Sequence, residues 1–286
     1  MRLSILTMKP NSHFVTSVRY AAERRDVDTD VIDLRRLLVR ADDDVRLIVD
    51  GKDITRAYDV CLARPLGKPT VSEFMFNISI LEIFRASRAN VVNKPEAYIN
   101  TCNKVLAYAK MAEAGLPIPR TIASRDLEVI RNSCNLLGER AILKPACGSR
   151  GRGVKYLSNL AETSAVELPV ICQRFVRGSD YDIRAFVVGE EVVAGMARRS
   201  GSVATNLSRG GEPSPLKLTE EQKELAIKAS VALGCEIAGV DIAEDRDGRE
   251  YLLEVNSQPD FIGLQRVADT DVADRVVTFM REKAVR

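Results

Sequence analysis

The sequence predicts an α/β part followed by two α+β parts. Three observations predict this fold class. Strand and helix patterns alternate over the first 93 residues, and short strands, one helix and a glycine-rich loop fill the stretch from Ile118 to about Leu168. From Val170 onward, paired strand patterns dominate. We therefore expect three compact subdomains, at residues 1–95, 96–171 and 172–286.

Composition excludes several classes of protein. The chain has 286 residues, a formal net charge of +2 and six cysteines. A net charge near zero provides no broad basic surface for nucleic acid, and no run of about 18 apolar residues predicts a membrane span. The start, MRLSILTMKP, turns polar too early for a signal peptide. The cysteines are scattered without a CxxC pair, which disfavours a zinc or redox site and indicates a reducing cytoplasm.

His13 is the single histidine of the sequence. A Ser-His-Asp triad, a Cys-His pair or a multi-histidine metal site would need histidine beside its other residues. We expect His13 in a loop or at the start of a helix. Any catalysis would then use carboxylates, lysines, arginines and a hard metal ion.

The first part has the pattern of a small open α/β sheet. The runs RLSILTM, TDVIDL, YDVCLAR and ANVVN predict strands, and EFMFNISILEIFRAS predicts a helix before the last of them. The run RADDDVR, between two strand signals, predicts a solvated turn.

Cap residues predict three later helices. The first covers Thr101 to Ala114, with Asn100 or Thr101 as N-cap and Gly115 at its end. The second covers about Glu220 to Leu233 and opens with a capping box, in which Thr219 precedes Gln222 by three residues. The last begins near Asp271 and places apolar residues on one side: Val272, Val276, Val277 and Met280.

The run LLEVN places two polar side chains inside an apolar strand. Glu254 and Asn256 are two residues apart, so they point to the same face. Upstream, Asp247-Gly248 is a strong hairpin signal, and a type I′ turn there sets Asp241 directly opposite Glu254. Asp241, Glu254 and Asn256 would then offer hard oxygen ligands to Mg²⁺, with waters and phosphates completing its shell. A solvated edge hairpin is the alternative.

The run ILKPACGSRGRGV places a glycine-rich loop after a strand that ends near Lys144. Gly148, Gly151 and Gly153 would let backbone N–H groups approach phosphate oxygens closely, with Ser149 and Arg150 beside them. The run is neither a Walker A loop nor a dinucleotide GxGxxG motif in its required place. A plain flexible turn is equally compatible with it.

Three further stretches contain charged residues that are candidates for ligand binding. Lys104 lies in the first turn of the first predicted capped helix, where surface solvation is its default explanation. In DIRAFVV, Asp182 and Arg184 share one strand face. MARRSGSVATNLSRGG supplies arginines suited to gripping carboxylate or phosphate, or else an exposed basic loop; its polar residues include Arg198, Arg199, Asn206 and Arg209.

Taken in order, these motifs resemble the ATP-grasp superfamily, and within it the RimK-like amino-acid ligases. The resemblance covers roughly residues 93 to 283, and the ending EVNSQPDFIGL…DVADRVV is most similar to members that add glutamate to pterin or deazaflavin cofactors. It implies an ATP-grasp fold of three subdomains, with ATP held between the central and C-terminal parts. The N-terminal part resembles the family only in general layout.

The resemblance also implies roles for residues. ATP phosphates would be bound by Lys104, Lys144 and the loop Gly148, Ser149, Arg150, Gly151 and Gly153. Adenine would be held by Gln173, Arg174, Phe175 and Val176, ribose would lie near Asp182, and Asn206 would contact the nucleotide. Asp241, Glu254 and Asn256 match the magnesium ligands, and Arg209, Lys144 and Arg198 match catalytic positions. Two departures stand out, Arg174 where many relatives have an acidic residue and Ala204 where RimK has arginine.

The implied reaction joins a carboxylate to an amine at the expense of ATP. ATP phosphorylates the carboxylate, and the amino group of an amino acid, L-glutamate in the best-matching members, attacks the acyl phosphate. The implied partners are Mg²⁺, with Mn²⁺ as a substitute, a small cofactor-like acceptor, and further copies of the chain in a dimer or tetramer. Alternatives are a protein tail or carrier protein as acceptor and a non-catalytic ATP-binding regulator. The misplaced glycines argue against a nicotinamide dehydrogenase.

Overall fold

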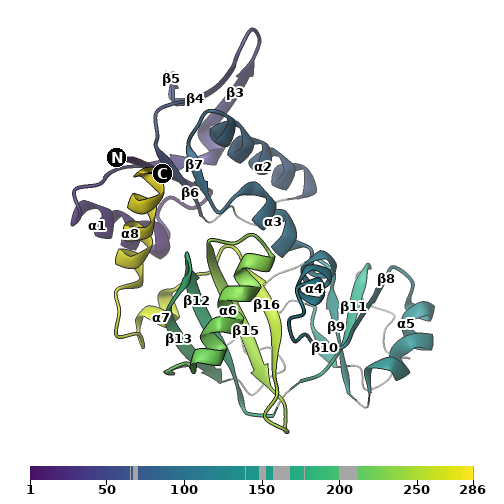
Figure 1. Ribbon diagram of the computed structural model, residues 1–286. Helices are drawn as coiled ribbons and strands as arrows, with labels where there is room; N and C mark the ends of the chain where they lie inside the picture. Colours follow the sequence, from purple (N-terminus) through teal and green to yellow (C-terminus); the bar gives the residue numbers. More distant parts are fainter. Residues whose placement is uncertain are drawn as a thin grey trace.

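The computed structural model describes residues 1–64, 66, 70–138, 140–147, 153–156, 168–176, 178–199 and 212–285. Their strands form four sheets, which Figure 1 shows as an N-terminal part above a C-terminal sheet, with the central sheet beside it. None of the described helices is both long enough and apolar enough to cross a membrane.

The N-terminal sheet is parallel, with the order β2–β1–β6–β7. Its strands are β1 (Arg2–Thr7), β2 (Asp28–Asp33), β6 (Val60–Ala63) and β7 (Asn90–Val92). Two helices pack against it: α1 (His13–Glu23), which begins at the predicted helix-start residue His13, and α2 (Val71–Ala86), which opens with a capping box between Thr70 and Glu73. The open α/β arrangement agrees with the strand–helix alternation, and α1 is an additional helix that no apolar run predicts.

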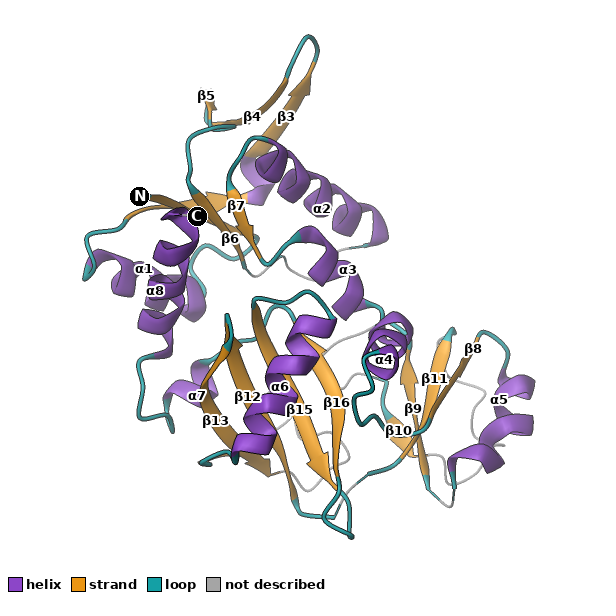
Figure 2. Cartoon of the chain, viewed as in Figure 1, coloured by secondary structure: helices purple, strands orange, loops and turns teal. Residues whose placement is uncertain are grey.

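A three-stranded hairpin sheet projects from this part, as the upper arm in Figure 2. It consists of β3 (Leu37–Ala41), β4 (Val45–Val49) and β5 (Lys52–Asp53), and the short 3₁₀ helix η1 (Leu34–Arg36) leads into it. The acidic run Asp42 to Asp44 forms the exposed turn between β3 and β4, as the sequence predicts.

The helix expected over Thr101–Ala114 is two helices instead. These are α3 (Pro95–Cys102) and α4 (Lys104–Glu113), which meet at Asn103. The Asn103 Oδ1 accepts hydrogen bonds from the amides of Val105 and Leu106, so Asn103 caps α4 and the predicted caps Asn100 and Thr101 are wrong. Pattern alone hides this break, because Asn103 lies inside an otherwise continuous helical sequence. Lys104 is nevertheless in the first turn, as expected.

The central sheet is antiparallel, with the order β10–β9–β11–β8. Its strands are β8 (Thr121–Ser124), β9 (Ala141–Pro145), β10 (Lys155–Tyr156) and β11 (Val170–Arg174). One side is covered by α5 (Leu127–Ser133) and the 3₁₀ helix η2 (Cys134–Leu137), which bury Ile130 and Leu137 against Leu143 and Val170. The other face of β9 and β11 carries Lys144 and Gln173 beside the buried Ile142 and Ile171.

The C-terminal sheet is antiparallel, with the order β14–β13–β12–β15–β16. Its strands are β12 (Tyr181–Val188), β13 (Glu191–Arg199), β14 (Glu212–Pro215), β15 (Ile237–Glu244) and β16 (Glu250–Asn256). Helix α6 (Glu220–Ala232) covers one face and buries Ala226 and Ala229 there. The capping box of Thr219 and Gln222 is confirmed. Because α6 takes one face, the other is shared by the charged side chains of Asp182, Arg184, Arg198, Asp241 and Glu254.

The chain ends against its own beginning. After α7 (Ile262–Gln265), helix α8 (Val272–Val285) packs beside α1, and both termini lie close together in Figure 1. The side of α8 that carries Val272, Val276, Val277 and Met280 is buried, as predicted. It completes a core shared with Leu3, Phe14 and Val60 of the N-terminal part.

Asn93 fastens the N-terminal sheet to the C-terminal sheet. Its Oδ1 accepts from the amides of Glu236 and Ile237, and its Nδ2 donates to the carbonyls of Ile237 and Ser257. The side chain is 2% exposed, and all of its hydrogen-bonding capacity is used. The segment that follows β16 is thereby tied to the end of β7.

Candidate functional site: a buried charge cluster

Asp241 and Glu254 lie directly opposite each other on β15 and β16. The predicted pairing is confirmed, but the predicted two-residue turn is wrong. A five-residue turn, 245–249, closes the hairpin, and its Asp245 Oδ1 accepts from the amides of Asp247 and Arg249. A register shift beside Asp241 leaves Leu253 as an extra residue in β16, which restores the pairing that the shorter turn would have produced.

Two arginines from neighbouring strands surround Asp241. Arg184 Nε is 2.6 Å from Asp241 Oδ1, without the angle of a hydrogen bond, and its Nη2 donates to Oδ2 at 3.1 Å. Arg198 Nη2 lies 2.9 Å from the same Oδ2. Burial raises the pKa of Asp241, and Asp182 and Glu254 act in the same direction, whereas the two arginines oppose them. The two arginines therefore offset part of the cost of burying this carboxylate.

Arg198 also holds Asp182 with a two-pronged ion pair. Its Nε and Nη2 donate to Oδ1 and Oδ2 at 2.8 and 2.7 Å. Burial acts to lower the pKa of Arg198, but Asp241 and Asp182 outweigh it and raise that pKa. Both side chains are buried, so Arg198 links two carboxylates within the cluster. Its predicted part in catalysis, and the ribose contact of Asp182, stay predictions.

Gly239 leaves the room that Arg184 needs. A Cβ atom at this position would lie 2.2 Å from Arg184 Nη1 and 2.7 Å from Pro259 Cβ. Gly239 pairs with Asn256 on β16, so the absence of a side chain lets Arg184 lie across the strand toward Asp241. Arg184 is absent from the site residues that the sequence predicts, although its shared face with Asp182 is a signal for it.

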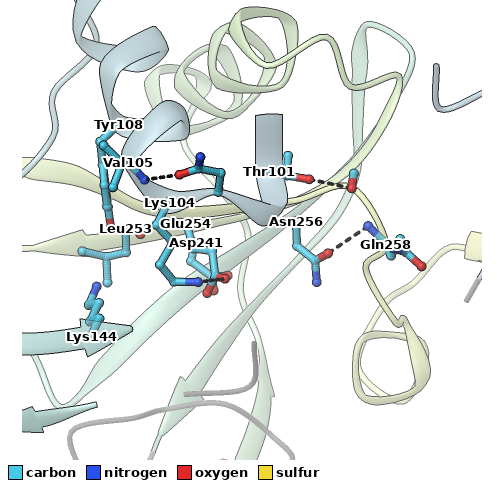
Figure 3. Close-up of polar contacts among 12 residues, drawn as sticks. Thr101, Lys104, Val105, Tyr108, Lys144, Asp241, Leu253, Glu254, Asn256 and Gln258 are labelled. Carbon is cyan, nitrogen blue, oxygen red and sulfur yellow. Dashed lines mark hydrogen bonds and ion pairs between the residues drawn. The ribbon is translucent and has the colours of Figure 1, made fainter. Parts of the chain in front are cut away.

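Glu254 faces Lys104 from the start of α4. Lys104 Nζ is 3.4 Å from Glu254 Oε1, and Figure 3 shows Lys104, Glu254 and Asp241 converging. Burial acts to raise the pKa of Glu254, but Lys104, Arg184 and Lys144 together hold it below its usual value. Glu254 is therefore ionised at neutral pH. Asn256 lies beside the pair, and its Oδ1 accepts from the Gln258 amide at 2.8 Å.

Lys144 reaches the same region from β9 but is held by an amide. Its Nζ donates to Gln173 Oε1 at 2.8 Å, and Gln173 Nε2 donates to Thr121 Oγ1 at 2.8 Å. Thr121 in turn donates to the Pro119 carbonyl, which fixes which end of the Gln173 amide faces Lys144. Desolvation lowers the pKa of Lys144, and Glu254 and Asp241 partly counter it. The side chain of Gln173 is fully buried against Lys144, and its expected part in holding adenine stays a prediction.

The remaining predicted hinge residues join the central and C-terminal sheets. Arg174 Nη2 is 3.5 Å from Asp245 Oδ2, and its guanidinium lies over the Tyr251 ring. Phe175 packs edge-on against Tyr156, and Val176 is buried. The arginine that departs from the family pattern thus contacts the turn between β15 and β16.

The glycine-rich loop and the arginine-rich loop are mostly outside the described residues. Of the glycine-loop residues expected at the phosphates, only Gly153 lies in the described part. Its φ is +71°, and a Cβ atom there would lie 2.7 Å from Pro145 Cγ. The predicted residues that lie outside the described part are Gly148, Ser149, Arg150, Gly151, Asn206 and Arg209.

The donor set fits a magnesium–nucleotide complex better than a bare ion. Two facing carboxylates and a nearby amide oxygen are hard ligands, but the described residues contain no group of three or more His, Cys, Asp or Glu side chains that could hold a metal. Four cationic side chains face three carboxylates across the described cluster, namely Lys104, Lys144, Arg184 and Arg198 against Asp182, Asp241 and Glu254. Excess positive charge suits a ligand that brings its own negative charge.

Comparison with known sequences identifies the family of this chain. A model of the RimK-like ATP-grasp domain matches residues 101–280. The chain belongs to the RimK-like ATP-grasp family. The tetrahydromethanopterin:alpha-L-glutamate ligase of Methanocaldococcus jannaschii is 32% identical over 97% of both chains. A probable alpha-L-glutamate ligase of Vibrio atlanticus is 28% identical over 99% of this chain and 96% of the relative.

Solved structures confirm the ATP-grasp fold. The ATP-grasp ligase PsnB with its minimal precursor has a TM-score of 0.80 at 21% identity and covers 99% of this chain and 98% of its own. Another PsnB complex, with a phosphomimetic precursor variant, Mg and ADP, has a TM-score of 0.77 at 22% identity and covers 98% of each chain. ATP-grasp ligases use ATP and Mg²⁺, so the RimK-like chain is expected to use both.

Arg198→Met should destabilise the RimK-like chain, because it removes a buried guanidinium that pairs with both Asp182 and Asp241. Breaking a buried ion pair costs about 3–5 kcal/mol, which corresponds to a Tm lower by about 5–10 °C. Arg199→Met is the matched control, since Arg199 is the next residue and is exposed. Thermal unfolding of both variants checks this. A fully stable Arg198→Met protein would contradict the structural role.

Proposed function

We propose that this chain is an ATP-dependent carboxylate–amine ligase that adds L-glutamate to a carboxylate of a small, cofactor-like acceptor. The observation that carries the proposal is the facing pair of the buried Asp241 and the partly buried Glu254, which contact cations from helix α4 and from strands β12 and β13. Glutamate is inferred from the alpha-L-glutamate ligases that align along nearly the whole chain.

Roles for the cluster follow from its charges. Asp241, Glu254 and Asn256 would hold Mg²⁺ or, in its place, Mn²⁺, and the ion would offset charge on the ATP phosphates. Lys104 and Lys144 would bind phosphate oxygens, and releasing Glu254 from Lys104 would free its oxygen as a ligand. Gly148, Ser149, Arg150, Gly151 and Gly153 would cover the phosphates, and Asn206 would contact the nucleotide.

The chemistry needs a positive site that excludes water. An oxygen of the acceptor carboxylate attacks the terminal phosphate of ATP, and ADP leaves. The glutamate amino group then attacks the acyl carbon, loses a proton, and expels inorganic phosphate as the amide forms. Lys144 and Arg209 would offset charge on the transferred phosphoryl group. Closure is required because water also attacks acyl phosphates.

The nucleotide base and sugar are assigned to the sheet junction. Arg174, Phe175 and Val176 would line the adenine side, where the buried Val176 and the Phe175–Tyr156 pair supply apolar surface. Asp182 would lie near the ribose.

We also propose that residues 1–95, 96–171 and 172–286 act as the three subdomains, and that the chain is cytoplasmic and forms a homo-oligomer. Its six unpaired cysteines suit a reducing compartment.

An isotope-transfer assay tests the ligase proposal. With ATP, Mg²⁺, L-glutamate and tetrahydromethanopterin labelled with ¹⁸O in its carboxylates, we expect ADP release to require both substrates. One ¹⁸O should then appear in the released phosphate. Peptide acceptors form a parallel arm. ADP release with unlabelled phosphate would contradict the acyl-phosphate route, and turnover on a peptide instead would replace the acceptor assignment.

Gln173→Leu should lower kcat/KM for ATP by about 10- to 100-fold, the range for losing a hydrogen bond to a charged group. Without the Gln173 amide, the Lys144 ammonium can turn toward Glu254 and form an ion pair with the carboxylate that would otherwise bind the metal. Gln222→Leu changes another buried glutamine, in the cap of α6, and should alter stability alone. Steady-state kinetics with varied ATP checks both variants. An unchanged kcat/KM in a folded Gln173→Leu protein would refute this role.

A further inference from the structure

Arg64 is a buried cation at the edge of the N-terminal sheet. It directly follows β6, as Asn93 follows β7, and β1 ends nearby at Thr7. These parallel strands have their carboxyl ends at one edge, the place where open α/β sheets bind ligands. The Arg64 side chain is 3% exposed. Arg64 therefore lies at the sheet edge where folds of this kind bind ligands, although no sequence motif marks it.

The guanidinium of Arg64 is only partly satisfied. Nη2 donates to the Pro259 carbonyl, and the Phe14 ring centre lies 4.0 Å from Cζ. Nε and Nη1 are buried without a hydrogen-bond partner, and no carboxylate of the described residues forms an ion pair with the side chain. Burial lowers the pKa of Arg64 to about 10, although Tyr98 and the Asp260 carboxylate act in the opposite direction, so Arg64 stays charged at neutral pH. A buried, unpaired charge of this kind is costly.

A purely structural role explains only part of this arrangement. If Arg64 only linked β6 to the segment after β16, it would need the hydrogen bond to the Pro259 carbonyl and the packing on Phe14. It does not need two further buried donors, each of which loses its water without replacement. An anionic acceptor would satisfy them, and a carboxylate matches the guanidinium in shape and charge.

Arg64 is connected to the charge cluster through Pro259. The position of a Cβ on Gly239 lies 2.7 Å from Pro259 Cβ and 2.2 Å from Arg184 Nη1, so Pro259 packs close to Arg184. Arg184 in turn contacts Asp241. Pro259 lies three residues after Asn256, the last residue of β16. A ligand at Arg64 would therefore lie near the end of the strand that carries the proposed metal ligands Glu254 and Asn256.

We propose that Arg64 binds the side-chain carboxylate of L-glutamate and selects glutamate over L-glutamine, which has a neutral amide in that place. The inference rests on the proposed function. L-Glutamate supplies the attacking amine, so both of its carboxylates stay ionised and need a cation. The carboxylate that becomes phosphorylated belongs to the acceptor and must meet the terminal phosphate of ATP, which we assign to Lys144.

Calorimetric binding to the full chain, with Mg²⁺ and ADP present, tests this role. The wild type should bind L-glutamate in preference to L-glutamine. Arg64→Met should weaken L-glutamate binding by about 10- to 100-fold, leave L-glutamine and Mg–ADP binding unchanged, and so remove the preference. Arg64→Lys, which keeps the charge, should recover part of it. Arg25→Met is the control, since Arg25 is a half-buried arginine paired with Asp274.

The possible results separate the two proposals. A wild type without preference for L-glutamate overturns the proposed substrate and this inference together. A selective wild type with equal selectivity in Arg64→Met overturns the role of Arg64 alone. Weaker binding of tetrahydromethanopterin, with L-glutamate unaffected, would assign the carboxylate to the acceptor and also overturn it. If Arg64→Met does not fold, full selectivity in Arg64→Gln overturns the role of Arg64 in the same way.

Discussion

The constraint on which this structure depends is the close approach of two facing carboxylates, the buried Asp241 and the partly buried Glu254. Like charges opposite each other on paired strands repel, and burial strengthens the repulsion. The fold compensates with Arg184 and Arg198 from strands β12 and β13, and with Lys104 from helix α4. Three sequence regions must therefore converge on one hairpin. A close pair of like charges destabilises the fold unless something binds between them. The pair therefore supports a charged ligand at this place.

The segment after β16 links that cluster to the N-terminal sheet. Ser257 accepts from Asn93 through its carbonyl and pairs with Thr101 through its hydroxyl, and the Pro259 carbonyl accepts from Arg64. Helix α8 then returns to pack beside α1. The segment after β16 and helix α8 thus both hold the N-terminal part against the C-terminal sheet, whose strand β16 carries Glu254 and Asn256.

Local rules predict much of this fold, and their failures have identifiable causes. Capping residues predict α6, and apolar spacing predicts the buried side of α8, because both depend on neighbours within one helix. The break at Asn103 escapes prediction because a cap inside a helical pattern leaves no gap in periodicity. The predicted pairing of Asp241 with Glu254 is right although the predicted turn is wrong, since a longer turn and an extra residue in β16 cancel. Arg64, Arg184 and the contact of Gln173 with Lys144 depend on tertiary contacts, which no local pattern reports.

The most direct test of the central claim is the affinity for ADP, measured by calorimetry with and without Mg²⁺, in the wild type and in Glu254→Gln. If the facing carboxylates hold a metal–nucleotide complex, Mg²⁺ should tighten ADP binding to the wild type by about 10-fold or more. The gain should largely vanish in the folded Glu254→Gln protein. An equal gain from Mg²⁺ in both proteins would contradict the account, because the carboxylate pair would then have another purpose.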